Sequence, residues 1–258
     1  MTLALVSADL LKLRRRRGLV AVVALLTVGA IAISNAIIEL LHLVDATAHG
    51  PAGGVTMLGH QAFTIGALGA VAAAVVGAVT GAGDLEAGVY RDLVVTGRSR
   101  LALYLSRLPA GLMFLLPFVA AAYAVEAVVS VAFAGYHPAP GVSLLVTTGL
   151  WTLLKVVFTY LVAVALAAAI ASRSYTIGIV LAWTLAVTPL LASISALGWV
   201  RKLVPGVAMD ALQPAALGQS ARQGLAIPMS TAAVVAVLLV WTAAALGIGA
   251  ARDTARDV

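Results

Sequence analysis

Runs of about twenty apolar residues recur along this chain, and they constrain its fold more than any other feature. An α-helix rises about 1.5 Å per residue, so such a run crosses a bilayer core about 30 Å thick. The sequence therefore predicts one all-α transmembrane domain, residues 1–258. Its six transmembrane helices are expected near residues 19–41, 62–82, 108–134, 144–171, 177–200 and 230–250.

The composition agrees with a membrane environment and excludes several kinds of site. Hydrophobic residues make up 62% of the chain and charged residues 10%, against about 45–50% and 25% in soluble domains. The chain has no cysteine, which excludes disulfides, thiolate catalysis and cysteine-bound zinc. The net charge of +6 comes from basic residues in short connections, so it indicates membrane topology rather than nucleic-acid binding.

The basic residues are divided unequally between the two sets of connections, and cytoplasmic segments carry the excess. The outer set holds only Arg201, Lys202 and Arg222. We therefore predict a multi-pass protein of the cell membrane with both termini in the cytoplasm, unless residues 201–229 hide another span. The inner set holds Lys12, Arg14, Arg15, Arg16, Arg17, Arg91, Arg98, Arg100, Arg107, Arg173, Arg252 and Arg256.

Two further segments are expected to contact membrane lipids without crossing the bilayer. Residues 1–17 carry an apolar stripe beside four arginines, which predicts an interfacial helix with its apolar face in lipid. Residues 201–229 are rich in proline and glycine, and their apolar pieces are too short to span, which predicts re-entrant or interfacial outer helices. The stripe consists of Leu3, Val6, Leu10 and Leu13.

The connection between spans two and three, residues 84–96, has the pattern of a short amphipathic helix. Leu85, Val89 and Leu93 recur every four residues, with acidic residues at the start and arginine later. Such a helix would give a soluble motor a rigid element to push. A solvated loop with topology-setting charges explains the same residues.

This connection resembles that of type 2 ABC exporter permeases, where E-x-x-G is followed by a pattern near L-L-x-T-P-x-S-R. Here Asp84 and Glu86 share the acidic role, and Gly97 stands in place of the proline. The resemblance extends to six spans, broken outer helices and a short charged tail. It implies a cytoplasmic coupling helix that docks on an ATPase through Asp84, Glu86, Gly88, Val89, Arg91, Asp92 and Arg98.

The resemblance also implies partners and a cargo. The chain has no G-x-x-x-x-G-K-[ST] phosphate loop, so ATP and Mg²⁺ are expected on a separate ABC ATPase, present in two copies. The chain itself is expected to bind no cofactor and to be no enzyme. It would pair with a second permease copy, identical or homologous, and export a hydrophobic or amphipathic drug, antibiotic, peptide or lipid by alternating access.

Related permeases line the transport path partly with spans two and five. Span two carries a ridge of small residues at intervals of four, which favours close helix packing over a substrate role. Span five carries hydroxyls at Thr184 and Thr188 that either bond backbone carbonyls freed by Pro189 or face a path. The ridge consists of Gly69, Ala73, Gly77 and Gly81.

Glu126 and Lys155 are ionisable residues well inside predicted spans. A charge in lipid is costly, so we expect the two to pair, or to contact substrate or gate the path. They also support an alternative, a secondary transporter that uses the pair. A membrane-embedded enzyme is a weaker alternative, because neither H-E-x-x-H nor G-x-S-x-G is present. No metal site is predicted, because the histidines lie near outer connections. These histidines are His42, His49, His60 and His137.

Overall fold

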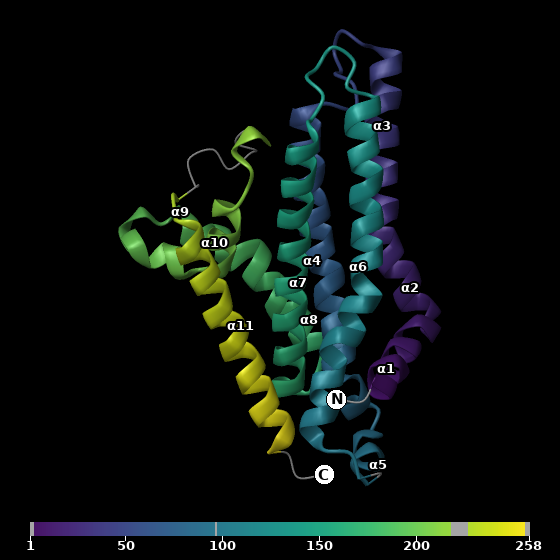
Figure 1. The fold of residues 1–258 in the computed structure, drawn as a ribbon, viewed down its shortest axis with the longest axis vertical. Coiled ribbons are helices and arrows are strands. Elements are labelled where there is room, and N and C mark those ends of the chain that lie inside the picture. The colour runs from purple at the N-terminus through teal and green to yellow at the C-terminus, as the bar shows by residue number, and fades with distance from the viewer. Residues whose placement is uncertain (1–2, 96, 218–226, 256–258) are drawn as a thin grey trace.

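The structure, a computed structural model, describes residues 3–95, 97–217 and 227–255. Within these residues, six helical segments are long and apolar enough to cross a membrane, which confirms the predicted number of spans. Figure 1 shows them as an elongated bundle, with α11 (Thr231–Thr254) on one flank and α3 (Ala30–Val44) on the other. These six segments are Arg17–Val44, Val55–Glu86, Arg100–Ala132, Val142–Ile170, Arg173–Ser193 and Thr231–Thr254.

The elements of the chain follow from the apolar runs and the residues that interrupt them. The first span consists of α2 (Arg17–Ala24), a π-helical turn η1 (Leu25–Gly29) and α3 (Ala30–Val44). The fifth consists of α8 (Arg173–Ala182), the π-helical turn η2 (Trp183–Val187) and α9 (Thr188–Ser193). The uninterrupted spans are α4 (Val55–Glu86), α6 (Arg100–Ala132), α7 (Val142–Ile170) and α11 (Thr231–Thr254).

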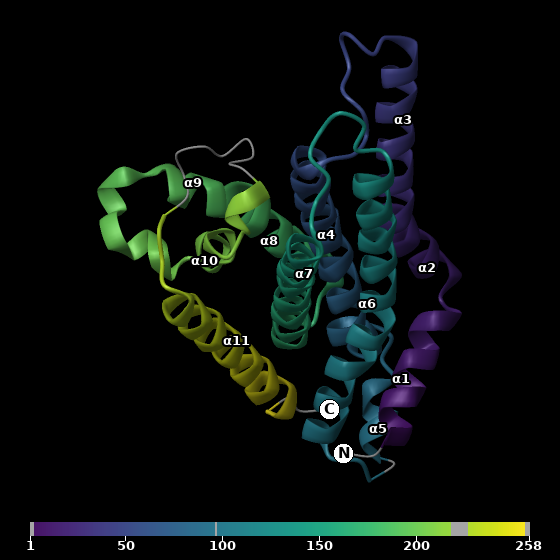
Figure 2. The ribbon, with the colours of Figure 1, turned by 45° about the horizontal axis from the view of Figure 1, so that its top comes forward.

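The helix α4 lies at the centre of the bundle, between α6 and α7 (Figures 1 and 2), and packs most extensively on α7. Its ridge of small residues faces this contact. A Cβ atom on Gly69 would lie 2.8 Å from Val156 Cγ2, and one on Gly77 would lie 2.6 Å from Ala163 Cβ. Ala73, between them, is fully buried. Because Gly69 and Gly77 have no side chain beyond a hydrogen atom, the two backbones can approach this closely.

The N-terminal helix α1 (Leu3–Arg15) does not direct its stripe to lipid as expected. Val6 and Leu13 are buried, and Leu10 packs against the main apolar core, whereas Leu3 is exposed. The helix packs along α6, which offers it a protein surface. The expectation of a lipid-facing stripe is therefore wrong for Val6 and Leu13, which are buried against protein.

The predicted coupling helix, residues 84–96, is also not a single helix. The helix α4 continues to Glu86, and a separate helix α5 covers Tyr90–Val95. Gly88 between them has φ +71° and Gly97 after them has φ +82°, backbone angles that glycine adopts readily and that interrupt a helix. Figure 1 shows α5 at the end of the bundle that also holds α1 and the end of α11; Thr96 lies outside the described residues.

The segment before the last span folds into short pieces beside α7 and α11. They are the 3₁₀ segment η3 (Ser195–Leu203), α10 (Pro205–Ala211) and the 3₁₀ turn η4 (Ala215–Leu217). Figure 2 shows α9 and α10 on the side of the bundle away from α3. The indole N–H of Trp151 on α7 donates a 2.8 Å hydrogen bond to the Met209 carbonyl, which fixes α10 to the bundle. Residues 218–226, with Arg222, lie outside the described part of the chain.

Replacing Gly77 by valine should destabilise the protein, because the new side chain meets Ala163 across the contact between α4 and α7. We expect a loss of about 1–3 kcal/mol, typical of overpacking, measured by unfolding in mixed detergent micelles. Gly247→Val on α11 is the matched control, since a Cβ there meets no atom within 4 Å. An equal loss in both variants would contradict the role given to the ridge.

Candidate functional site

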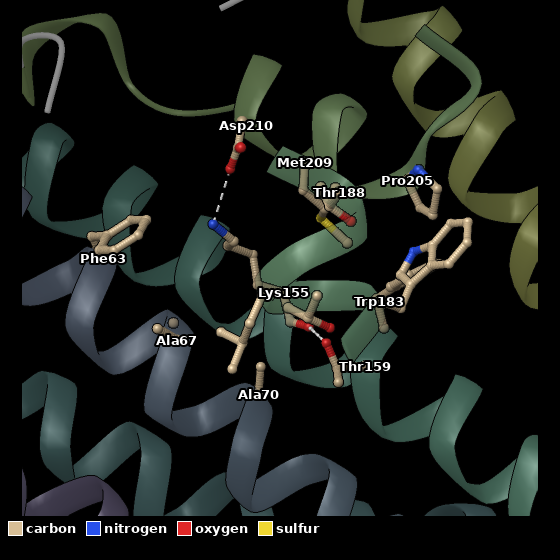
Figure 3. Close-up of a pocket in the computed structure, with 15 residues that line it drawn as sticks. Phe63, Ala67, Ala70, Lys155, Thr159, Trp183, Thr188, Pro205, Met209 and Asp210 are labelled. Carbon is tan, nitrogen blue, oxygen red and sulfur yellow. Dashed lines mark hydrogen bonds and ion pairs between the residues drawn. The ribbon is translucent and has the colours of Figure 1, made fainter. Parts of the chain in front are cut away.

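An open pocket lies between α4, α7, η2, α9 and α10 (Figure 3). Its cavity volume is about 110 Å³, and its wall is mainly apolar. The pocket exists because the π-helical turn η2 and the short helix α10 interrupt the regular packing beside α7. Its lining residues include Phe63, Ala67, Ala70, Lys155, Phe158, Thr159, Trp183, Thr184, Leu185, Thr188, Pro205, Met209 and Asp210.

Lys155 is the cation of this pocket and comes from the middle of α7. Its ammonium donates a 3.1 Å hydrogen bond to the Asp210 carboxylate on α10. It also lies 4.5 Å from the ring centroid of Trp151 and 5.6 Å from that of Phe63. Aromatic faces attract a cation, so an opposite charge and two rings hold the lysine in place.

The two threonines predicted on the transport path lie in the same pocket as Lys155. The Thr184 hydroxyl donates a 2.7 Å hydrogen bond to the Val180 carbonyl one turn earlier. Pro189 removes the N–H that would bond the Leu185 carbonyl, so the Thr184 bond, which is made to Val180, does not satisfy the carbonyl freed by the proline. Thr188 is buried, and its methyl group contacts Gly206 at the start of α10.

Glu126 lies elsewhere, on α6, so the expected pair with Lys155 is not formed. The Asn35 amide on α3 donates a 2.9 Å hydrogen bond to the Glu126 carboxylate. Gln61 on α4 in turn donates a 2.8 Å bond to Asn35 Oδ1. Glu126 and Lys155 thus each bind a partner on another helix. Two residues at a similar depth in the membrane do not necessarily face each other.

A second polar group, which we name the inner cluster, lies at the end of the bundle near α5. Arg107 on α6 is 2% exposed, and its guanidinium lies 3.6 Å from the Asp253 carboxylate on α11 and 3.9 Å from that of Asp84. Lys12 on α1 pairs with Asp84 at 3.3 Å, and Tyr90 on α5 donates a 2.6 Å hydrogen bond to Asp253. The inner cluster therefore ties five helices together.

Tyr90 shows how firmly α5 is attached. Its side chain is buried, and the Arg107 guanidinium lies 5.3 Å from its ring centroid. Burial, and then the hydrogen bond to Asp253, raise the pKa of its hydroxyl. The hydroxyl therefore stays protonated and donates throughout the physiological range.

The residues predicted to dock an ATPase divide into two groups. Asp84 belongs to the inner cluster, and Glu86 accepts hydrogen bonds from the backbone and side chain of Arg173 at the start of α8. Gly88, Val89, Asp92 and Arg98 are exposed around α5, and the side chain of Arg91 lies outside what the structure describes. Asp84 and Glu86 thus join helices of this chain, whereas Gly88, Val89, Asp92 and Arg98 are open to contact.

The sequence pointed to some of these residues and missed others. Arg107 was assigned to a connection because the apolar run begins after it, yet α6 starts at Arg100 and carries it inside. The sequence pattern places Asp253 in a charged tail and Asp210 in an outer connection. A polar residue that interrupts an apolar segment, such as Asn35, was the signal that could have found the Glu126 partner.

Thermodynamic coupling should separate the real pair of Lys155 from the expected one. We expect Lys155→Met and Asp210→Asn to be non-additive by about 1–2 kcal/mol in a double-mutant cycle, as for residues in contact. Lys155→Met and Glu126→Gln should be additive, and they form the control cycle. Unfolding in mixed micelles gives both values; coupling to Glu126 but not to Asp210 would refute the assignment.

No protein-family model matches this chain, and no curated protein matches it. Among the residues that the structure describes, no group of three or more His, Asp and Glu side chains is placed to hold a metal ion. Two features of the structure therefore bear on the function of the chain: the pocket around Lys155, and the exposed helix α5 that is anchored to the inner cluster.

Proposed function

We propose that this chain is the membrane-spanning permease subunit of a type 2 ABC exporter. A separate ABC ATPase, in two copies, binds ATP and Mg²⁺ and drives two permease subunits, identical or homologous. The pair moves a hydrophobic or amphipathic molecule from the cytoplasm or the inner leaflet of the cell membrane outward by alternating access. The ATPase docks on α5, which acts as the coupling helix.

The observation that carries this proposal is the attachment of α5. It connects two helices of 32 and 33 residues, α4 and α6. Its first residue, Tyr90, is buried and bonded to α11, while Asp92 and Val95 are exposed. A soluble partner that pushes on the exposed side therefore acts on α4, α6 and α11 together.

The distribution of charge supports a cytoplasmic position for α5. The end of the bundle that holds α1, α5 and the end of α11 carries Lys12, Arg98, Arg173 and Arg252. The connections at the far end, residues 45–54 and 133–141, carry no lysine or arginine, and Arg201 and Lys202 belong to η3 at the side of the bundle. The excess of positive charge marks the cytoplasmic side. The ends of α1 and α11 near the termini then lie in the cytoplasm, and η3 and α10 form the re-entrant outer segment.

The pocket supports an amphipathic cargo. It combines an apolar wall with one ion pair, the arrangement that binds an apolar body and orients a single polar group. The alternative of a secondary transporter rested on a Glu126–Lys155 pair. Since Asn35 and Asp210 take those two partners, this alternative loses the contact on which it depended.

Substituting an exposed residue of α5 should abolish ATPase binding without harming the membrane fold. We expect the wild-type chain, co-expressed with candidate ABC ATPases, to co-purify with its partner and to hydrolyse ATP. Val95→Asp should lose both properties, because a charge replaces an apolar contact. The control is Val44→Asp at the opposite end of the bundle, since Val95 and Val44 are 77% and 78% exposed.

Two results would contradict this proposal. One is the absence of any co-purifying ATPase when the native partner is among those tested. The other is equal binding by the wild type and Val95→Asp. Circular dichroism and size-exclusion elution of each variant would show whether the membrane fold is intact.

A further inference from the structure

We propose that the pocket beside Lys155 binds the anionic head of a single-chain amphiphile, such as a fatty acid. The carboxylate of the ligand takes the place of Asp210 on the lysine, and the tail runs over the apolar wall (Figure 3). This inference names the substrate class of the proposed exporter and rests on that function for its meaning in transport. Binding itself can be tested on the chain alone.

The fixed position of Lys155 is the first reason. Its stem runs beside Gly66, where an added Cβ would lie 3.6 Å from Lys155 Cδ, and its ammonium contacts two aromatic rings. An ammonium has three N–H donors, and Asp210 accepts one of them. The remaining N–H donors of the ammonium can bind further acceptors, and an anionic group provides them.

Two of the three threonine hydroxyls in the wall do not compete for this function. Thr159 and Thr184 donate hydrogen bonds of 2.9 Å and 2.7 Å to carbonyls of their own helices. Their donor protons are therefore engaged, and Lys155 is the group that can bind a ligand anion most strongly.

The position of Asp210 is the second reason, because it decides the sign of the ligand charge. Its side chain is 28% exposed against 18% for Lys155, and it belongs to the seven-residue helix α10. An anion needs only to share or displace this one carboxylate. A cation would have to remove the ammonium from Asp210 and from both rings, so the pocket favours an anion.

The size and opening of the pocket indicate one long chain. The volume of about 110 Å³ is below the roughly 300–1,000 Å³ that encloses a drug-sized ligand. Leu185 at the rim is 59% exposed, so the pocket opens on the surface of the bundle. The head and first carbons of an amphiphile therefore occupy the pocket, while the rest of its tail lies in the bilayer.

Equilibrium binding to the purified chain in phosphatidylcholine nanodiscs tests this inference. Three radiolabelled probes with the same tail length are compared: dodecanoate, dodecyltrimethylammonium and dodecyl maltoside, with empty nanodiscs as the background for partitioning into lipid. We expect saturable binding of dodecanoate above that background. Saturable binding that is tightest for the cationic or the neutral probe would overturn the proposal.

Two conservative substitutions give opposite expectations. Lys155→Gln should weaken dodecanoate binding about tenfold or more, as expected for loss of a charge-assisted hydrogen bond. Asp210→Asn should strengthen it several-fold, because it removes the competing charge and keeps the side-chain shape. Damage to the fold would weaken binding in both variants, so shifts in the same direction would overturn the inference.

A third measurement distinguishes binding of a free amphiphile from binding of a lipid headgroup. The same set of experiments also separates this inference from the exporter proposal. Nanodiscs that contain phosphatidylglycerol should leave dodecanoate binding unchanged, whereas displacement would assign the site to a membrane lipid and refute a single-chain ligand. No ATPase is present in these measurements. Failure of an ATPase to co-purify would therefore contradict the exporter proposal but leave the binding result unchanged. Failure of dodecanoate to bind would contradict this inference but leave the exporter proposal unchanged.

Discussion

The close contact between α4 and α7 is the constraint on which the rest of the fold depends. In lipid, apolar side chains gain little from leaving the solvent, so helices associate where small residues let many atoms touch. Gly77 and Gly81 bring the backbone of α4 against α7, with a Cβ on Gly81 only 2.5 Å from the Val164 carbonyl oxygen. The helices α6, α8 and α11 then pack around this pair.

Polar residues determine how the outer helices attach to that central pair. Lys155 is satisfied from α10, Glu126 from α3 and Arg107 from α11. Each contact joins a residue deep in one helix to a residue on an element far away in the sequence. Because an unpaired polar group in a low-dielectric interior is costly, these contacts specify which neighbour each helix must have.

The sequence predicts the six spans and the small-residue ridge because both depend on local patterns. The length of an apolar run indicates directly whether a helix can cross the membrane, and small residues at intervals of four indicate that they share one face of a helix. The partner of Lys155 could not be predicted, because depth in the membrane leaves the rotation and the neighbours of a helix undetermined. The break at Gly88 was hidden for a different reason, since a glycine in an amphipathic pattern fits both a helix and a turn.

The packing of α1 on α6 has a consequence for how the chain is made. Val6 and Leu13 reach their buried positions only against helices that follow in the sequence, and α6 begins at Arg100. During synthesis, α1 leaves the ribosome long before this surface exists. The apolar side chains of α1 therefore reach their native contacts only after α6 has been made.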